Sequence, residues 1–470
     1  MNKEKNRIII VLTGFCMLFT ILIGYLSYFQ VFKAEAVKNN SYNKRLWLNE
    51  ENVLRGSILD RNGRVLVYSE KNDKSSTRYY KYGNLYSHII GYSYREYGKA
   101  GLELAYNNAL LNINENAAIN EIKNLVLPSS VGNDLRLTID HSLQEKARGL
   151  LKGRKGAIVA MNPRTGEIYA MVSLPDFDTS NLRENWKSIS EDPNSPLLNR
   201  ATQGLYTPGS VFKIITTVAA LETPELEKHY SCSGTTKIDG YIFKDYNSKA
   251  HGEVDLKKAF VKSCNTYFAE KSLIIGKEKL GNTAEKFMFN NKISFDLPTK
   301  ISQFSYKGNI GKTDLAASGI GQGKTLVTPL NMAMVASSIA NDGVMVKPIL
   351  VKEIVNKDGK ILRTNKTEIL STVGSSALTN EVKEMMMEVV QSGTGTNGRI
   401  KNVKVAGKTG TAENPSGNTH SWFVGFAPAM EPKIAVAVIL EESGTTGGQG
   451  AAPIARDIII HGLNNIDFRE

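Results

Sequence analysis

A serine and a lysine stand three positions apart in the apolar stretch LYTPGSVFKIITTVAALE, residues 205–222. Residues at i and i+3 share one face of a helix, so we expect the Ser210 hydroxyl and the Lys213 ammonium to be neighbours. Serine becomes a nucleophile when a base removes its proton, and a lysine can be that base when burial and nearby positive charge lower its pKa. The pattern alone is weak, because Ser41 and Lys44 have the same spacing in a polar region.

Two later stretches supply the other groups that acyl transfer needs. Ser263 and Asn265, in KSCNTYF, offer a second hydroxyl for proton relay and an amide that can hold a peptide carbonyl. The stretch VKVAGKTGTAE is expected to form a strand that carries Lys408 and three small residues, Thr409, Gly410 and Thr411. The lysine adds positive charge, the two hydroxyls suit a substrate carboxylate, and the glycine leaves space for a ligand along the strand edge.

These elements read S-x-x-K, S-x-N and K-T-G, and in this order the chain resembles the penicillin-binding proteins and serine β-lactamases. Flanking stretches narrow the resemblance to class B penicillin-binding proteins, among them RGSILDRNGRVL, TGEIYAMVSLPDFD, LLNRATQGLYTPGSVFK, HGEVDLKKAFVKSCNTYF, GIGQGKTLVTPLNMA and SGTGTNGRIKNVKVAGKTGTAE. The similarity runs from about residue 53 to the C-terminus. No segment resembles the glycosyltransferase domain of the bifunctional class A proteins, so the resemblance implies cross-linking of glycan strands without their polymerisation.

The resemblance implies a serine-type D-alanyl-D-alanine transpeptidase. Ser210 would attack the carbonyl between the two terminal D-alanines of a donor stem peptide, releasing D-alanine and leaving an acyl-enzyme. Lys213 would accept the serine proton, Ser263 would pass a proton to the leaving amine, and Lys408 would support that transfer electrostatically. An amine of a neighbouring stem peptide would then receive the acyl group, which closes the cross-link.

The same resemblance assigns the residues that bind substrate. Asn265 would hold the donor peptide backbone, and the terminal carboxylate would lie against Thr409, Gly410 and Thr411. The backbone N–H groups of Ser210 and Thr411 would form the oxyanion hole. β-Lactam antibiotics would acylate Ser210 because they mimic the D-alanyl-D-alanine terminus. No cofactor is expected.

The implied partners are peptidoglycan stem peptides on nascent glycan strands, β-lactams and a membrane-embedded glycan polymerase. Nucleic acid is not an expected partner, because no zinc-finger spacing, RRM signature or basic helix accompanies the net charge of +12. Two alternatives stay open: a hydrolase of the same fold (a D,D-carboxypeptidase or a membrane-anchored β-lactamase) and a β-lactam sensor. The sequence leaves open whether the chain acts in elongation, division or sporulation, which amine it accepts, its β-lactam affinity and its oligomeric state.

The chemistry requires segments near residues 210, 264 and 409 to converge, and the predicted elements suggest how. Alternating apolar residues predict a hairpin over residues 156–173, and Asn62-Gly63 predicts a second. Asp140 can cap a helix after the strand DLRLTI, and helical stretches dominate between the 156–173 hairpin and about residue 395. Strands return in VKVAGK, HSWFVGFAP and KIAVAVILEE before a final helix. We expect an α/β (α+β) fold of the penicillin-binding and serine β-lactamase type.

The N-terminal region contains an uncharged run of 25 residues, 8–32, which exceeds the roughly 20 residues that cross a bilayer as a helix. Ala34-Glu35-Ala36 resembles a cleavage site, but the run is longer than the apolar core of a signal peptide. We expect a retained single-pass anchor in the cell membrane with the N-terminus cytoplasmic and the catalytic domain outside. The predicted division is a cytoplasmic tail (1–7), an anchor (8–32), a stalk (33–54), a small β-rich N-terminal module (55–140) and the transpeptidase domain (141–470).

Several other features suggest sites only weakly. The stretch GIGQGKT resembles a phosphate loop, but Ser318 stands where its first glycine belongs, so ATP binding is not expected. The family resemblance implies a loop near the active-site wall instead. The six histidines show no clustered ligand spacing, so we expect no metal site, and His251 is expected to fix a local turn. Cys232 and Cys264 could form a disulfide, or remain free thiols, which is the default expectation. Trp422 and Phe423 are expected in the core or the cleft wall rather than in contact with a ligand. The tyrosines at 79, 80, 82 and 86 could form a partner surface, but ordinary packing is the default expectation.

Overall fold

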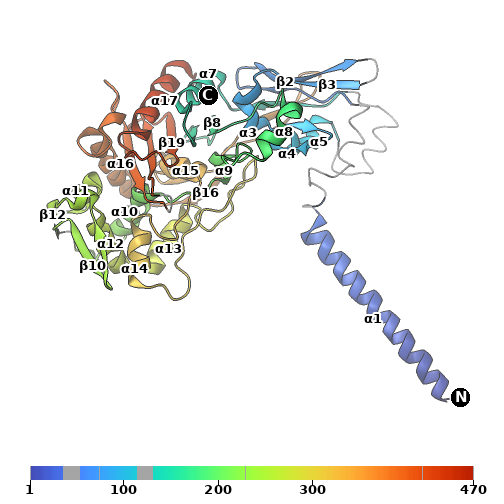
Figure 1. The fold of residues 1–470 in the computed structure, drawn as a ribbon, viewed down its shortest axis with the longest axis horizontal. Helices are drawn as coiled ribbons and strands as arrows, with labels where there is room; N and C mark the ends of the chain where they lie inside the picture. The colour runs from blue at the N-terminus through green and yellow to red at the C-terminus, as the bar shows by residue number, and fades with distance from the viewer. Residues whose placement is uncertain are drawn as a thin grey trace.

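The computed structural model describes residues 2–34, 37, 53–72, 75–113, 131–227, 229–414 and 417–468. Helix α1 (Asn2–Phe32) contains the predicted anchor and projects at the N-terminus in Figure 1. Its segment Glu4–Phe32 has a mean hydropathy of 2.5 in its most apolar window, and none of that window is buried. The helix is therefore long and apolar enough to span a bilayer. Most of the predicted stalk lies outside the described residues.

A five-stranded antiparallel sheet forms the centre of the large domain. Its strands, in spatial order, are β17 (Ala406–Ala412), β18 (His420–Ala427), β19 (Ile434–Leu440), β7 (Gly156–Met161) and β8 (Ile168–Leu174). The first hairpin predicted from alternation is β7–β8, and Gly166 in its turn has a φ of +81°, which glycine adopts without strain. The three C-terminal strands are also confirmed, and they lie beside a hairpin from far earlier in the chain.

Both faces of this sheet are covered by helices, so successive residues of a strand enter two different cores. Val436 and Val438 of β19 pack in the core with α7 (His141–Leu151) and α17 (Ala451–Asn465). Ala437 and Ile439 face the other way, in the core that contains α15 (Pro329–Ala340). Figure 1 shows α7 and α17 together at one side and α15 beside β19. This burial on both faces explains why these strands are almost continuously apolar.

A second sheet of six strands holds the predicted N-terminal module. Its order is β15 (Ile361–Thr364), β14 (Val351–Val355), β6 (Asp134–Leu137), β1 (Ile58–Leu59), β2 (Val65–Asn72) and β3 (Ser75–Tyr80). The predicted Asn-Gly hairpin is β1–β2, and Asp140 caps α7 by accepting a hydrogen bond from the Leu143 N–H at 2.9 Å. Because β14 and β15 come from residues 351–364, the sheet combines segments from both sides of residue 140. The domain boundary at that residue stays a prediction.

Short elements complete this module, and its tyrosines divide between the core and the surface. These elements are η2 (Gly83–Tyr86), α3 (Ser87–Ile90), β4 (Ser93–Tyr94), β5 (Gly98–Lys99), α4 (Gly101–Ala105) and α5 (Asn107–Leu110). Tyr80 and Tyr86 are buried, whereas Tyr79 is exposed and stacks on Tyr68. Core packing therefore explains the presence of Tyr80 and Tyr86.

The middle of the chain is mainly helical, as predicted. Its longer helices are α8 (Leu182–Ser190), α10 (Lys213–Leu221), α11 (Leu256–Lys262), α12 (Asn265–Ile275), α13 (Lys277–Lys286), α14 (Lys312–Gly319), α15 and α16 (Ser376–Gln391). Single turns occur at α9 (Arg200–Gln203), η3 (Gly209–Phe212), η4 (Tyr246–Ser248) and η5 (Thr396–Gly398).

The structure also contains short strands in this region that the sequence did not predict. They are β9 (Tyr230–Cys232), β10 (Thr235–Ile238), β11 (Tyr241–Lys244), β12 (Gly252–Val254), β13 (Val344–Val346) and β16 (Ile369–Thr372). They form two-stranded ribbons: β9 with β12, β10 with β11, and β13 with β16. Strands of three or four residues are too short for alternation to be visible, which is why they were missed.

Candidate active site

Ser210 lies in η3, immediately before α10, at the edge of a cleft of about 910 Å³. Gly209 precedes it with a φ of +56° and donates its N–H to the Gly321 carbonyl at 2.8 Å. Gly321 belongs to the GIGQGKT stretch, and its neighbours Ile320 and Gln322 line the same cleft. The prediction that this stretch forms the active-site wall is therefore confirmed.

Lys213 begins α10 and is completely buried. Its ammonium donates to the Ser263 carbonyl oxygen and to Asn265 Oδ1, both at 2.7 Å, and reaches Ser263 Oγ at 3.4 Å. Burial lowers its pKa to about 8, against the opposing influence of Cys264 and Asp245, which raise it. In the described part of the chain no hydrogen bond joins Lys213 to Ser210, a contact that can form on substrate binding.

Ser263 ends α11 in the left-handed conformation, with a φ of 59°. This backbone is unusual for a residue other than glycine, and it turns the chain so that the Ser263 hydroxyl faces two lysines. Lys408 Nζ donates to Ser263 Oγ at 2.9 Å, and Lys213 Nζ lies 3.4 Å away on the other side. Burial together with the positive charge of Lys213 holds the pKa of Lys408 well below its usual value. The hydroxyl can therefore exchange protons with either amine.

Asn265 is the first residue of α12, and its side chain is held at both ends. Its Oδ1 accepts from Lys213, and its Nδ2 donates to the Lys244 carbonyl at 2.9 Å. Its backbone N–H donates to Asp245 Oδ1. The amide is thus fixed at the wall of the cleft, since Asn265 and Asp245 both line it.

Strand β17 carries the third motif at the edge of the central sheet. Thr409 and Thr411 line the cleft together with Ser210. Thr409 Oγ1 is hydrogen bonded to Thr394 Oγ1 at 2.6 Å, and Thr411 Oγ1 accepts from the Gly447 N–H at 3.2 Å. The convergence of the three motifs on one cleft is therefore confirmed, whereas the role of each residue stays a prediction.

Gly410 has a packing reason that differs from the expected one. A Cβ atom there would lie 2.8 Å from the Pro208 carbonyl oxygen and 3.0 Å from Val211 Cγ1. The glycine thus allows β17 to approach the segment that carries Ser210. Trp422, on β18, is fully buried and donates its indole N–H to the Thr207 carbonyl at 3.0 Å, which ties the same segment to the sheet.

Sequence reasoning did not single out two residues that the structure places at the cleft. Asp245 holds the backbone of Asn265, and Thr394 is hydrogen bonded to Thr409. Thr394 belongs to the stretch SGTGTNG, which carries part of the family resemblance, so a signal for it existed. Asp245 follows a short strand in a polar region with no periodic pattern, and only its tertiary contact identifies it.

The arrangement suits nucleophilic acyl transfer. A half-buried serine faces a cleft whose wall holds an amine of lowered pKa, a hydroxyl hydrogen bonded to a second such amine, and an anchored amide. Lysines 244, 249, 258 and 262 also line the cleft and make it positive, which favours a substrate that carries carboxylates.

Comparison with family models matches two parts of the chain. Residues 156–460 match the model described as "Penicillin binding protein transpeptidase domain". Residues 55–132 match the one described as "Penicillin binding protein A dimerisation domain". Together these matches cover most of the chain, and the first contains all three motifs.

Relatives and solved structures agree with these matches. The chain is 31% identical to the peptidoglycan D,D-transpeptidase PbpA of Mycolicibacterium smegmatis over 98% of this chain and 99% of the relative. A D,D-transpeptidase domain structure from Eggerthella lenta is 34% identical, with a TM-score of 0.79 over 88% of this chain and 99% of that one. A ceftriaxone acyl-enzyme complex of penicillin-binding protein A from M. tuberculosis is 30% identical, with a TM-score of 0.83 over 88% of this chain and 100% of that one.

Proposed function

The chain belongs to the class B penicillin-binding proteins, and we propose that it is a peptidoglycan D,D-transpeptidase with Ser210 as its nucleophile. The observation that carries the proposal is the Ser263 hydroxyl between Lys213 and Lys408, on the wall of the cleft that Ser210 lines. Relatives that the chain matches over nearly their whole length are named D,D-transpeptidases, which favours transfer over the hydrolase and sensor alternatives.

Acylation begins with proton transfer from Ser210 to the neutral form of Lys213. The serine oxygen attacks the carbonyl carbon between the two terminal D-alanines, and the backbone N–H groups of Ser210 and Thr411 stabilise the oxyanion. Ser263 then delivers a proton to the departing amine of D-alanine and regains one from Lys213, which carries the proton of Ser210, while Lys408 supports the transfer electrostatically. Atoms balance: the serine ester replaces the amide, and the serine proton leaves on D-alanine.

Substrate recognition follows from the charge and hydrogen-bonding groups of the cleft. Asn265 aligns the donor backbone, while the Thr409 and Thr411 hydroxyls donate hydrogen bonds to the terminal carboxylate in a positive environment. An amine of a second stem peptide then attacks the ester carbonyl, and Ser210 regains its proton. A β-lactam follows the first half of this path, but its ring opens without a departing group, so the acyl-enzyme persists. The ceftriaxone complex of the M. tuberculosis relative is such a species.

Helix α1 supports a single-pass anchor that holds the domain near its substrate. Stem peptides are attached to glycan strands outside the cell membrane, so we propose an N-terminus in the cytoplasm and a catalytic domain outside. A membrane-embedded glycan polymerase is the proposed partner, because this chain has a transpeptidase domain but no match to a polymerase domain among the family models found.

The function is tested in a depletion strain complemented with the wild-type chain or with Ser210→Ala. The variant should lose labelling by fluorescent penicillin completely and fail to restore muropeptide cross-links, because the proposed acyl-enzyme ester forms on the Ser210 oxygen. Ser41→Ala, at the other S-x-x-K spacing, is the matched control and should behave as wild type. Labelling that persists in a folded Ser210→Ala protein rejects the nucleophile, and unchanged cross-linking with longer pentapeptide stems on depletion rejects transfer.

A further inference from the structure

Glu413 is an exposed acidic residue that directly follows β17 and lines the active-site cleft. The other acid among the described residues that line the cleft is Asp245, which is buried. Its carboxylate accepts hydrogen bonds from the Asn265 N–H and the Thr266 hydroxyl. The Glu413 carboxylate, in contrast, has no hydrogen bond or ion pair with another described residue. It is therefore a negative charge that a ligand in the cleft can use.

Alternation along β17 places Glu413 on the same side of the strand as the two threonines of the third motif. Successive residues of a strand point to opposite faces, and Thr409, Thr411 and Glu413 all line the cleft. Ala412, between the last two, is buried. At about 3.4 Å per residue, Glu413 lies about 7 Å beyond Thr411 and about 17 Å beyond Lys408 along the strand direction.

The cleft is therefore electrically polarised along this strand. At the start of β17, Lys408 donates to Ser263, and the exposed Lys262 precedes Ser263 in the chain. The other exposed lysines that line the cleft come from β11, the turn after η4 and α11: they are lysines 244, 249 and 258. Positive charge gathers around the elements that Lys408 meets, and Glu413 stands at the opposite end of the strand.

In the proposed mechanism the donor peptide fits this polarity in one direction. Its scissile carbonyl lies at the N–H groups of Ser210 and Thr411, and its terminal carboxylate lies towards Lys408. Among the described strands β17 pairs only with β18, so an extended peptide can lie along its outer edge. The part of the donor before the scissile bond then runs towards Glu413. At about 3.3 Å per residue, the residue before the acylated D-alanine lies beside the end of the strand.

That part of a stem peptide carries an amine. In the proposed reaction one stem peptide supplies the acyl group and another supplies the amine, and D-alanine has only a methyl side chain. The amine therefore belongs to a residue before the two D-alanines. While it is unused, this primary amine is an ammonium ion at neutral pH, since alkyl amines have a pKa of about 10. The lysines of the cleft repel this cation, whereas Glu413 attracts it.

We propose that Glu413 forms an ion pair with the side-chain ammonium of the donor residue that precedes the D-alanyl-D-alanine terminus. The inference rests on the proposed function and adds a substrate class to it, namely donors that contain a diamino acid with a free amine. An amine that has already accepted an acyl group is a neutral amide and loses the ion pair. The chain thus prefers donor stem peptides that have not yet acted as acceptors. Glu413 binds the donor and takes no part in proton transfer.

The test compares two penicillins that differ only in the charge of their acyl side chain. One carries an ε-aminocaproyl group, which is a lysyl group without its α-amine. The other carries the same group acetylated on its terminal nitrogen. Competition with fluorescent penicillin gives the second-order rate constant for acylation of the full-length chain in detergent micelles. The wild type should react about threefold faster with the cationic penicillin, as expected for an exposed ion pair.

Variants show whether this preference depends on Glu413. Glu413→Gln should react with both penicillins at the same rate, and Glu413→Lys should favour the acetylated one about threefold. The matched control is Glu442→Gln, because Glu442 accepts a hydrogen bond from Asn414, next to Glu413, but does not line the cleft. It should keep the wild-type preference. The preference is a ratio measured within one protein, so a general loss of activity in a variant cancels.

Salt provides a measurement that a purely structural role would not change. Raising sodium chloride from about 0.05 M to about 0.5 M should reduce the wild-type preference, because screening weakens ion pairs between exposed groups. A preference that persists in Glu413→Gln, or that Glu442→Gln loses to the same extent, would overturn the ion pair.

The outcomes also separate this inference from the proposed function. A wild-type chain that both penicillins acylate at equal rates contradicts the ion pair alone. A Glu413-dependent preference in a chain whose Ser210→Ala variant is still acylated supports the ion pair and contradicts the assigned nucleophile. A chain that neither penicillin acylates contradicts the proposed function, and the ion pair with it.

Discussion

At the scale of single residues, the site depends on two buried amines that share one hydroxyl. A buried ammonium is unfavourable unless it is paired or used, and Lys213 has three oxygen acceptors in the Ser263–Asn265 turn. Burial nevertheless brings its pKa down to about 8, so about a tenth of the molecules hold it neutral at pH 7. This fraction is available as the base without an additional residue.

The pH dependence of acylation should report Lys213. In the proposed mechanism the neutral amine is the base, so the second-order rate constant for penicillin acylation should rise about tenfold from pH 7 to pH 9, through the pKa of about 8. The charged and titratable groups that influence this amine are Lys408, Cys264 and Asp245. Lys271→Met, at another buried lysine, is the control and should keep the same profile. A flat profile would exclude Lys213 as the base.

Lys408 should act through Ser263, because its ammonium donates to that hydroxyl. Lys408→Met keeps the length of the side chain and should reduce the acylation rate by about 10²-fold, because proton transfer through Ser263 loses its electrostatic support. If Lys408 and Ser263 act as one unit, the double variant Lys408→Met/Ser263→Ala should be acylated no more slowly than the slower of the two single variants. Stopped-flow measurement of the acylation rate compares the wild type, the two single variants and the double variant. If the fold-losses of the single variants multiply in the double variant, the two residues have independent roles.

At the scale of elements, the geometry depends on the approach of β17 to η3. Gly410 permits that approach, and Trp422 ties the Thr207 carbonyl to β18. Among the described strands β17 pairs only with β18, so its outer edge can receive an extended substrate. The proposed nucleophile Ser210 and the threonines proposed to bind the carboxylate thus belong to elements that contact each other directly.

Gly410→Ala should impair both stability and acylation. The new Cβ would lie 2.8 Å from the Pro208 carbonyl oxygen, so η3 must shift, at about 1–3 kcal/mol of unfolding free energy. Gly149→Ala makes the same chemical change on the exposed face of α7, where no atom lies within 4 Å, and should stabilise by about 0.5–1 kcal/mol. Thermal denaturation compares the stability of the two variants, and penicillin labelling compares their acylation. Wild-type behaviour of Gly410→Ala would show that the contact does not constrain the site.

At the scale of the whole molecule, the six-stranded sheet joins the N-terminal module to the large domain. Strand β6 pairs with β1 on one side and with β14 on the other. Within the module, the fully buried Glu103 carboxylate is paired with Arg55 and Arg78. Burial raises the pKa of Glu103, but the two guanidiniums outweigh it and hold the pKa below its usual value. This ion cluster connects β3, α4 and the chain preceding β1.

Glu103→Gln should destabilise the module by about 3–5 kcal/mol, because two buried arginines lose their counter-ion. Limited proteolysis should then cut first within residues 55–113, while fluorescent penicillin still labels the large domain. Glu353→Gln is the control, since its pairing with Arg136 is partly exposed. Equal protease resistance of the two variants would mean that the buried cluster contributes little to the module.

The sequence by itself determined the features that local patterns encode. The three motifs predict the chemistry, the uncharged run of 25 residues predicts a helix long enough to span a membrane, and alternation and turn residues predict the β1–β2 and β7–β8 hairpins. Each is a property of neighbouring residues, because hydrophobic periodicity and backbone preferences act over a few positions. The helix cap at Asp140 could be predicted for the same reason.

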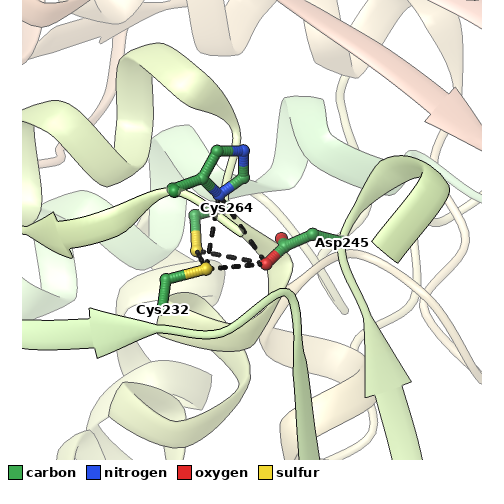
Figure 2. A group of neighbouring side chains, drawn as sticks. Cys232, Asp245 and Cys264 are labelled. Atoms are coloured by element: carbon green, nitrogen blue, oxygen red, sulfur yellow. Dashed lines mark hydrogen bonds and ion pairs between the residues drawn. The ribbon is translucent and has the colours of Figure 1, made fainter. Parts of the chain in front are cut away.

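Only the tertiary structure decided which distant groups meet. The acceptors of Lys213, the packing role of Gly410 and the pairing of β14 with β6 join residues far apart in the chain. The Cys232, Asp245, His251 and Cys264 cluster (Figure 2) is the sharpest case, since irregular spacing hides it and short ribbons assemble it. Its two cysteines are free, with their sulfur atoms 3.5 Å apart. Contacts of this kind depend on how several elements pack at once, and no local pattern along the chain records that packing.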